Sequence, residues 1–291
     1  PPPVTAVSDL PYVTIPHCTE VMGLVSLPVG AAASESTPVQ LLLTCCQQNV
    51  WFYHWPDDTI EAPGATRGFN LPGPVQQFVA IPQGGVLITP ASIHLLSMTH
   101  GLGCIARCRN SLGAVVAPSG RWFATCDGQT QHNQLELVIR QLKIQPGLPV
   151  KICSLKRVPI PTQEEEFVDV LPLDDGHIAV VLRQRSRTIF HIATRRGSYL
   201  GALSVEVPIL QLVPTSRPYR FMALELNHPH ALLIIDLKPF RIMRYRVDIA
   251  PQWLFETAIG YGALNDAGEC SLLNEEGQIV SRIAGLPCPT A

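Results

Sequence analysis

Charged residues are scarce in this chain of 291 residues: Asp, Glu, Lys and Arg make up 15% of it, against about 25% in an average domain. Lys and Arg total 21 and Asp and Glu total 23, which gives a formal net charge of −2. Because neither sign dominates, we expect no attraction of nucleic acid or of an anionic membrane surface by bulk charge.

Long apolar runs are also missing. The longest candidates, such as Ala231–Ile235, have the length of a strand, whereas a membrane span needs roughly 18 to 20 apolar residues. Pro1–Pro3 lacks the charged start and apolar core of a signal peptide. The 9 cysteines are odd in number and two of them, Cys45 and Cys46, are adjacent, which does not fit a regular disulfide framework. We predict a protein without a membrane span, in the cytoplasm or a similar reducing environment.

Helical periodicity and the common catalytic motifs are absent as well. The 27 prolines are spread along the chain, and no window of about a dozen residues keeps an apolar stripe at helical spacing without one. There is no Gly-Lys-Ser/Thr loop, no Gly-x-Ser-x-Gly elbow and no Gly-x-Gly-x-x-Gly motif before a helix. The sequence therefore has no signature of a nucleotide-binding protein or a serine hydrolase, and we predict that it is not an enzyme and has no cofactor.

What the chain does contain is a repeated hairpin: a short apolar strand, a turn rich in Pro, Gly, Ser or Asp, and a second apolar strand. Copies begin at Gly23, Phe78, Ala114, Val168, Leu210 and Leu254. Each is followed by a third strand and usually a fourth. Four short strands per unit of about 40 to 50 residues is the period of a β-propeller. We predict an all-β fold, a single ring of six or seven four-stranded blades, with a pair of β-sandwiches as the structural alternative.

The clearest turn, Ala117-Pro118-Ser119-Gly120-Arg121-Trp122, resembles the Ser-Pro-Asp-Gly turn of WD40-like propeller blades, and Pro172-Leu173-Asp174-Asp175-Gly176 is similar. The repeated Gly-His pair and the Trp-Asp dipeptide of that family are missing, and Ile235-Asp236 only approximates the latter. The sequence thus resembles a degenerate WD40-like propeller. This resemblance implies the fold and transfers no catalytic or binding residue.

This interpretation divides the chain into two segments. Residues 21–291 are predicted to form the propeller. Residues 1–20 are predicted to contain a strand at Tyr12–Ile15 that pairs with the last blade and closes the ring, which would remove two exposed sheet edges. Because the first residue is Pro and not Met, we also consider that the chain is a domain of a larger polypeptide.

Several groups of residues could bind a metal, but each has a simpler explanation. His228 and His230 flank a proline in a predicted turn, and Asp174 and Asp175 also lie in a turn, where Asp normally hydrogen-bonds its own backbone. Cys104, Cys108 and Cys126 do not have the spacing of a four-ligand zinc site. We predict no metal site and expect buried thiols.

The most unusual charge pattern is a basic stretch that follows an acidic one. Glu164, Glu165 and Glu166 precede a predicted blade, and Arg183, Arg185 and Arg187 lie in its second-to-third-strand loop. In a propeller these two loops share one face, whereas Arg195 and Arg196 would emerge on the opposite face. The two loops either neutralise each other or form the polar half of a protein-binding surface. Too few aromatic residues are interleaved for RNA binding.

We therefore predict a non-catalytic scaffold or adaptor that binds one or more proteins, as a domain or subunit of a larger complex. The alternative is a propeller hydrolase with a divalent cation in its central channel. That alternative requires several carboxylates to converge, and the candidates are Asp127, Asp169, Asp174, Glu225 and Asp266.

Overall fold

The computed structural model describes residues 4–6, 20–27, 39–46, 49–55, 65–71, 73–75, 77–81, 84–89, 91–97, 101–108, 110–129, 134–143, 145, 151–257 and 260–286. Within these ranges every regular element is a β-strand, as the scattered prolines and the missing helical stripe predicted. The chain divides into two compact units, one formed by residues 1–11, 164–194 and 199–291 and the other by residues 12–163 and 195–198.

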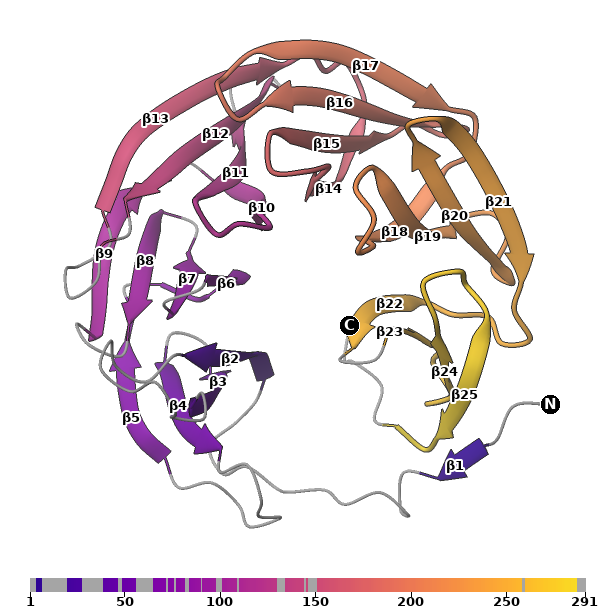
Figure 1. Ribbon diagram of the computed structural model, residues 1–291, viewed down its shortest axis with the longest axis horizontal. Helices are drawn as coiled ribbons and strands as arrows, with labels where there is room; N and C mark the ends of the chain where they lie inside the picture. Colours follow the sequence, from indigo (N-terminus) through magenta and orange to yellow (C-terminus); the bar gives the residue numbers. More distant parts are fainter. Residues whose placement is uncertain are drawn as a thin grey trace. The chain divides into compact units, whose positions relative to one another are not determined.

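The unit of residues 12–163 contains three antiparallel sheets of four strands each, with the strands in chain order (Figure 1). The first sheet holds β2 (Glu20–Leu27), β3 (Val39–Cys46), β4 (Asn49–Trp55) and β5 (Ala65–Asn70). The second holds β6 (Gln77–Ile81), β7 (Gly84–Ile88), β8 (Ser92–Ser97) and β9 (Gly101–Arg107). The third holds β10 (Ser111–Val116), β11 (Trp122–Gln129), β12 (Gln134–Lys143) and β13 (Lys151–Ile160).

The other unit repeats this arrangement in three further sheets. One holds β14 (Glu166–Pro172), β15 (His177–Arg183), β16 (Thr188–Thr194) and β17 (Tyr199–Val205). The next holds β18 (Ile209–Pro214), β19 (Arg220–Glu225), β20 (Ala231–Leu237) and β21 (Phe240–Arg246). The last holds β22 (Trp253–Thr257), β23 (Gly260–Leu264), β24 (Cys270–Leu273) and β25 (Ile279–Ala284). All six hairpins expected from the sequence are thus present, each within a sheet of at least four strands.

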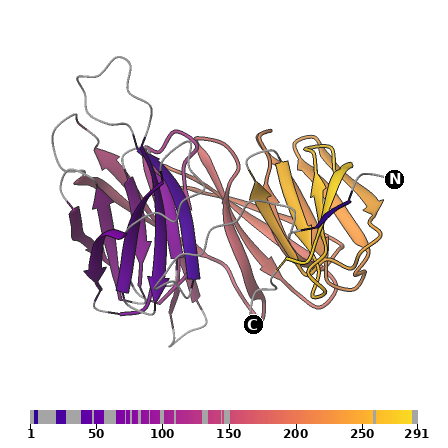
Figure 2. The ribbon, with the colours of Figure 1, turned by 90° about the horizontal axis from the view of Figure 1, so that it is seen from below.

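A strand from the N-terminal segment adds to the last sheet. This strand is β1 (Val4–Ala6), which pairs in parallel with β25, Val4 opposite Arg282 and Ala6 opposite Ala284. Figures 1 and 2 both show this short indigo strand beside the yellow β25. The predicted strand at Tyr12–Ile15 lies outside the described residues, and the closure of a ring by residues 1–20 stays a prediction.

The cores of the unit that contains β14–β25 lie between successive sheets, because its central strands are buried on both faces. All six residues of β19 are buried. Phe221 and Ala223 pack in one apolar cluster with residues of β15 and β16. Met222 and Leu224 pack in another with residues of β22, β23 and β24. Successive side chains of a strand point to opposite faces, so a continuous apolar run supplies two cores at once.

The turns have the chemistry that the sequence indicated. In the β10–β11 turn, the Gly120 N–H donates to the Ala117 carbonyl at 2.8 Å, and Gly120 has a φ of 67°, which glycine adopts without strain. In the β14–β15 turn, Asp174 Oδ1 accepts from the backbone N–H groups of Gly176 at 2.6 Å and His177 at 2.7 Å. The prediction that Asp174 serves its own turn is confirmed.

Candidate protein-binding surface

The acidic and basic stretches singled out in the sequence lie at the same end of one sheet. Glu166 begins β14 and Arg183 ends β15, and the two residues are opposite each other in the antiparallel register. Glu164 and Glu165 precede β14, while Arg185 and Arg187 lie between β15 and β16. The predicted proximity of the two loops is therefore present in the structure.

Arg183 connects two neighbouring sheets through its hydrogen bonds. Its Nη2 donates to Glu166 Oε2 at 2.7 Å, and its Nη1 donates to the Ile209 carbonyl at 2.9 Å. The Arg183 side chain is 14% exposed, whereas that of Glu166 is 68% exposed. Arg183 thus joins the end of β15 to the start of β18 in the next sheet, and its charge is largely withdrawn from solvent.

The other two arginines of these loops differ in their hydrogen bonds. Arg187 Nε donates to Gln184 Oε1 at 2.5 Å, and Gln184 Nε2 donates to Glu165 Oε1 at 3.0 Å, so Gln184 connects the two loops. Arg185 is exposed and makes no hydrogen bond or ion pair to any residue that the structure describes. Arg185 is therefore the cation of this group that is most available to a partner.

Two exposed leucines adjoin these loops, and the sequence analysis did not identify them. Leu210 follows Ile209, whose carbonyl binds Arg183, and Leu226 is tied to the same place by its N–H, which donates to the Pro208 carbonyl at 2.9 Å. Their side chains are 37% and 42% exposed. In the sequence both leucines border apolar strands, so nothing distinguished them from core residues. We call the set of Glu164–Glu166, Arg183, Arg185, Arg187, Leu210 and Leu226 the loop surface.

Arg195 and Arg196 follow β16, whereas Arg187 precedes it. The two groups therefore lie at opposite ends of that strand, as the sequence predicted.

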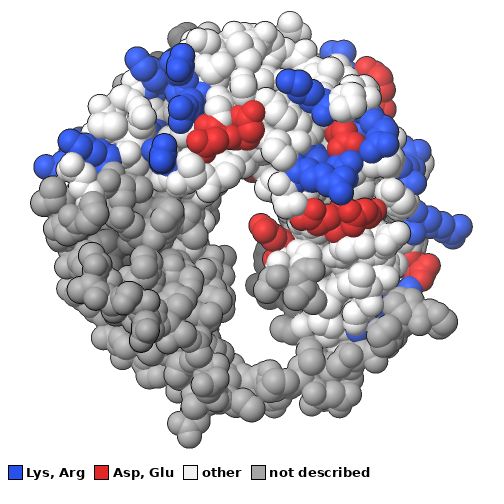
Figure 3. Space-filling view, viewed as in Figure 1, with Lys and Arg blue, Asp and Glu red and all other residues white. Residues whose placement is uncertain are grey.

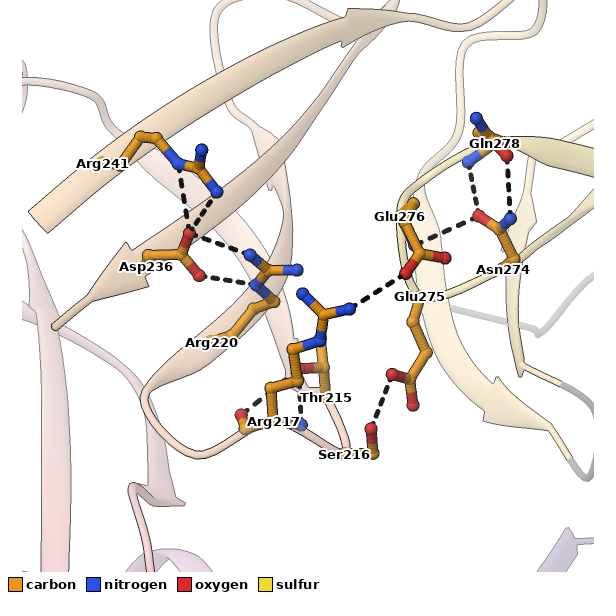
Figure 4. A network of polar contacts seen from close by, with 10 residues as sticks. All are labelled: Thr215, Ser216, Arg217, Arg220, Asp236, Arg241, Asn274, Glu275, Glu276 and Gln278. Carbon is orange, nitrogen blue, oxygen red and sulfur yellow. Dashed lines mark hydrogen bonds and ion pairs between the residues drawn. The ribbon is translucent and has the colours of Figure 1, made fainter. Parts of the chain in front are cut away.

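Asp236, in the dipeptide that approximates the Trp-Asp motif of WD40-like blades, has a structural role. Asp236, near the end of β20, accepts from Arg220 Nε at 2.6 Å and Arg220 Nη2 at 3.0 Å, and from Arg241 Nη2 at 3.0 Å. Figure 4 shows the two guanidinium groups converging on this carboxylate. The hydrogen bonds from Arg220 are the main cause that holds the pKa of Asp236 below its usual range.

A second set of contacts in Figure 4 joins the β18–β19 turn to the β24–β25 turn. Ser216 Oγ donates to Glu275 Oε2 at 2.6 Å, and Arg217 Nη2 donates to Glu276 Oε1 at 3.3 Å. Figure 3 shows acidic and basic side chains beside one another over these strands. Both side chains of the Arg217–Glu276 pair are more than half exposed, so we expect it to contribute under about 1 kcal/mol.

Asp174 is the centre of a small polar cluster. Besides its two backbone partners, it lies 3.0 Å from His177 Nδ1 and accepts from the Tyr219 hydroxyl at 2.9 Å. Burial alone would raise the pKa of Asp174, but the hydrogen bonds from Gly176, His177 and Tyr219 outweigh it and lower that pKa. Burial and the neighbouring Asp174 raise the pKa of Tyr219 to about 12. The carboxylate is therefore saturated by protein donors.

The carboxylates considered for a cation site have separate surroundings. Asp127 lies on β11, Asp169 on β14 and Asp266 in the β23–β24 turn, while Glu225 pairs with Arg244 at 2.8 Å and His228 at 3.4 Å. Among the residues that the structure describes, no three His, Cys, Asp or Glu side chains are grouped so that they could hold a metal ion. No observation on these residues favours the hydrolase alternative.

The histidines considered for metal binding have separate partners, and two of the cysteines are buried. His228 contacts Glu225, whereas His230 Nδ1 lies 3.1 Å from the Ile249 carbonyl. Cys108 and Cys126 are buried thiols, as expected, and burial is the main cause that raises the pKa of Cys126. The side chain of Cys104 lies outside the described residues.

Comparison with known proteins identifies the fold. The structure is similar to the Pan2 WD40 domain of Neurospora crassa, with a TM-score of 0.57, 11% identity, and coverage of 92% of this chain and 79% of that one. It is similar to Kluyveromyces lactis Hsv2, with a TM-score of 0.55, 7% identity, and coverage of 86% and 82%. It is also similar to Saccharomyces cerevisiae Sqt1, with a TM-score of 0.59, 10% identity, and coverage of 84% and 71%.

The comparisons at the level of sequence are negative. No family model matches the chain, and no curated protein matches it. The predicted β-propeller and its WD40-like character are thus confirmed at the level of the fold. Within the described residues, no helix has the length and hydropathy that a membrane-spanning segment requires.

Proposed function

Because the fold is that of the WD40 β-propellers, we propose that this chain is a non-catalytic scaffold that binds one or more proteins as part of a larger complex. The observation that supports this proposal best is the composition of the loop surface. It combines exposed apolar side chains, Leu210 and Leu226, with an exposed cation, Arg185, and the exposed carboxylates of Glu164 and Glu166. Apolar anchors bordered by charged groups are typical of transient protein interfaces.

The hydrogen bonds within the loop surface also support binding. Arg183 is held between Glu166 and the Ile209 carbonyl, and Gln184 is held between Glu165 and Arg187. Loops that are ordered before a partner arrives lose less conformational entropy on binding. We propose that Arg183 and Arg187 position this surface, while Arg185, Leu210 and Leu226 contact the partner.

The thiols support a reducing location such as the cytoplasm. Cys108, Cys126 and Cys270 are buried, and burial is the main cause that raises the pKa of Cys126 and of Cys270. Buried thiols with raised pKa values are weakly reactive. We propose that these residues pack as small apolar side chains.

The test is affinity capture from native lysate at moderate salt, with the purified chain as bait and mass spectrometry as the readout. We expect a stoichiometric protein partner that is lost with Arg185→Glu and with Leu210→Asp. Matched controls are Arg121→Glu, at an exposed arginine of the β10–β11 turn, and Val280→Asp, at a β25 side chain that is 47% exposed. Equal loss with the controls, or capture of background proteins alone, would contradict the proposal.

A further inference from the structure

A basic cavity is formed within the unit of residues 12–163 and 195–198. Its volume is about 470 Å³. Trp122 and Ile139, which are 1% and 2% exposed, form its apolar floor. Its polar lining comes from the end of β12, the middle of β13 and the β16–β17 turn, and consists of Gln141, Ser154, Lys156, Arg195 and Arg196.

The charged side chains that line this cavity have one sign. Three cationic side chains line it, and no carboxylate does. Lys156 and Arg196 make no ion pair or hydrogen bond with any residue that the structure describes. The next residue of β13 shows the contrast, since Arg157 is paired with Glu136. In a chain whose net charge is −2, two cations that are unpaired among the described residues, in a lining without a carboxylate, are a local feature that attracts an anion.

Backbone and side-chain contacts hold the lining together. Gly197, in the turn that carries both arginines, has a φ of 92°. A Cβ at this position would lie 3.0 Å from the Lys156 Cβ and 3.4 Å from its Cγ, so glycine lets the turn pack against the lysine stem. The Ser154 hydroxyl donates to Gln141 Oε1 at 3.2 Å, and the Gln141 Nε2 group has no hydrogen-bond partner among the described residues. Ammonium, guanidinium and amide donors therefore line the same cavity. Figure 3 shows Lys and Arg side chains gathered over β13 near this turn.

We propose that this cavity binds a phosphorylated Ser, Thr or Tyr side chain of a partner protein. A phosphate monoester carries a charge of about −1.5 to −2 and three strong acceptor oxygens near pH 7, which matches the cations Lys156 and Arg196 and an amide donor. Guanidinium groups bind such oxygens in a bidentate manner, and the apolar floor accommodates the carbon atoms next to the phosphate. This inference rests on the proposed scaffold function and assigns it a second contact with the partner.

Two other anionic partners fit the cavity less well. Electrostatic attachment to an anionic membrane uses clusters of about 4 to 8 basic residues on one surface, and this site offers three cations in a hollow. Single-stranded nucleic acid binds by stacking its bases on exposed aromatic rings, and Trp122 is only 1% exposed.

The first experiment measures binding to the purified chain by fluorescence anisotropy. The probes are a degenerate peptide library with a fixed central phosphothreonine and the same library without the phosphate. We expect binding at least about tenfold tighter for the phosphorylated library, loss of that preference with Lys156→Glu and with Arg196→Glu, and its retention with Lys156→Arg. Lys151→Glu, on the same strand but outside the lining, is the matched control, and circular dichroism checks the fold of each variant.

Three results would overturn the inference. One is equal affinity for the two libraries. Another is loss of the preference with Lys151→Glu to the same degree as with Lys156→Glu. The third is stronger binding, at equal phosphate concentration, to vesicles of phosphatidylcholine with a phosphoinositide or to a single-stranded oligonucleotide, which would assign the cavity to a membrane or to nucleic acid.

A second experiment separates this inference from the scaffold proposal by repeating the affinity capture with phosphatase-treated lysate. A partner that is lost after phosphatase treatment and with Lys156→Glu supports both. A partner that is retained under both conditions, but lost with Arg185→Glu, contradicts the phosphate site and leaves the scaffold. If no protein is captured while the phosphopeptide library still binds, the scaffold proposal fails and the site stands.

Discussion

Substitution of Asp236 by alanine removes the acceptor that two arginines share. Arg220 and Asp236 are each 8% exposed, and their two hydrogen bonds measure 2.6 and 3.0 Å. A charge-assisted hydrogen bond contributes about 1.5 to 3 kcal/mol, and loss of one partner of a buried pair typically costs about 3 to 5 kcal/mol, because the other charge stays buried and unpaired. We expect Asp236→Ala to lower the free energy of unfolding by about 3 to 5 kcal/mol.

Two further variants separate the sources of this loss. Arg241 also binds Asp236, but its side chain is 57% exposed, so Arg241→Ala should cost under about 1 kcal/mol. The double variant Arg220→Met/Asp236→Leu removes both buried charges, and we expect its stability to lie within about 1 kcal/mol of the wild type. If the single variants Arg220→Met and Asp236→Leu each cost about 3 to 5 kcal/mol, the coupling energy from the double-mutant cycle should be about 5 kcal/mol or more.

The assay is urea unfolding followed by circular dichroism and tryptophan fluorescence at pH 7 and at lower pH. Because Arg220 holds the pKa of Asp236 below its usual 3.8, the pair stabilises the fold above that pH and less so as pH falls through the folded-state pKa. The difference between wild type and Asp236→Ala should thus be full at pH 7 and shrink below pH 4. A loss under 1 kcal/mol at pH 7, or a double variant as unstable as the sum of the two single ones, would refute the reasoning.

Three other substitutions have distinct signatures. Burial raises the pKa of Asp169 from 3.8 to about 6, although a hydrogen bond from the Val170 N–H opposes the shift, and the folded state therefore loses stability as pH rises from about 4 to 6. Asp169→Asn should stabilise the fold by about 1 to 2 kcal/mol at pH 7.5 and not at pH 4. A difference in urea midpoint that does not depend on pH would contradict this prediction. Thr188 is fully buried, and its hydroxyl donates to the Val207 carbonyl at 2.8 Å and accepts from the Ile209 N–H at 2.9 Å. In thermal unfolding, Thr188→Val should lower the free energy of unfolding by about 2 to 4 kcal/mol and Thr188→Ser by under about 1.5 kcal/mol. Equal losses in the two variants would exclude the hydrogen bonds as the cause. Gly260 has a φ of 146°, and a Cβ there would lie 2.2 Å from the Leu273 carbonyl oxygen, whereas a Cβ at Gly103 would meet nothing within 4 Å. In urea unfolding, Gly260→Ala should therefore lower the free energy of unfolding by about 2 kcal/mol or more and Gly103→Ala by under about 1 kcal/mol. Similar values for the two variants would contradict the steric argument.

The sequence predicted the elements that depend on neighbouring residues. The turns at Pro118–Gly120 and Asp174–Gly176 were predictable, because proline, glycine and aspartate bend the chain through their own backbone and side-chain chemistry. The β19 and β20 strands were predictable from continuous apolar runs. The proximity of Glu166 to Arg183 was predictable as well, because the blade topology fixes which loops share an end of the sheet.

The remaining features depend on contacts between distant segments. Sequence alone did not predict that Arg183 binds the Ile209 carbonyl of the next sheet, which makes it a positioning residue and leaves Arg185 as the exposed cation. It also did not place Lys156 beside the turn of Arg195 and Arg196, since no local pattern relates β13 to that turn. It also did not predict the pairing of Val4–Ala6 with β25, because three residues are too few to show a pattern.

The alternation along β19 has an evolutionary consequence. Phe221 and Ala223 belong to one core and Met222 and Leu224 to the next. A single inserted or deleted residue within this strand would move every following side chain to the opposite face and exchange the contents of two cores at once. Changes of length are therefore tolerated in the turns and selected against in the strands, so homologues of this protein should differ in the lengths of their turns while their central strands keep the same number of residues.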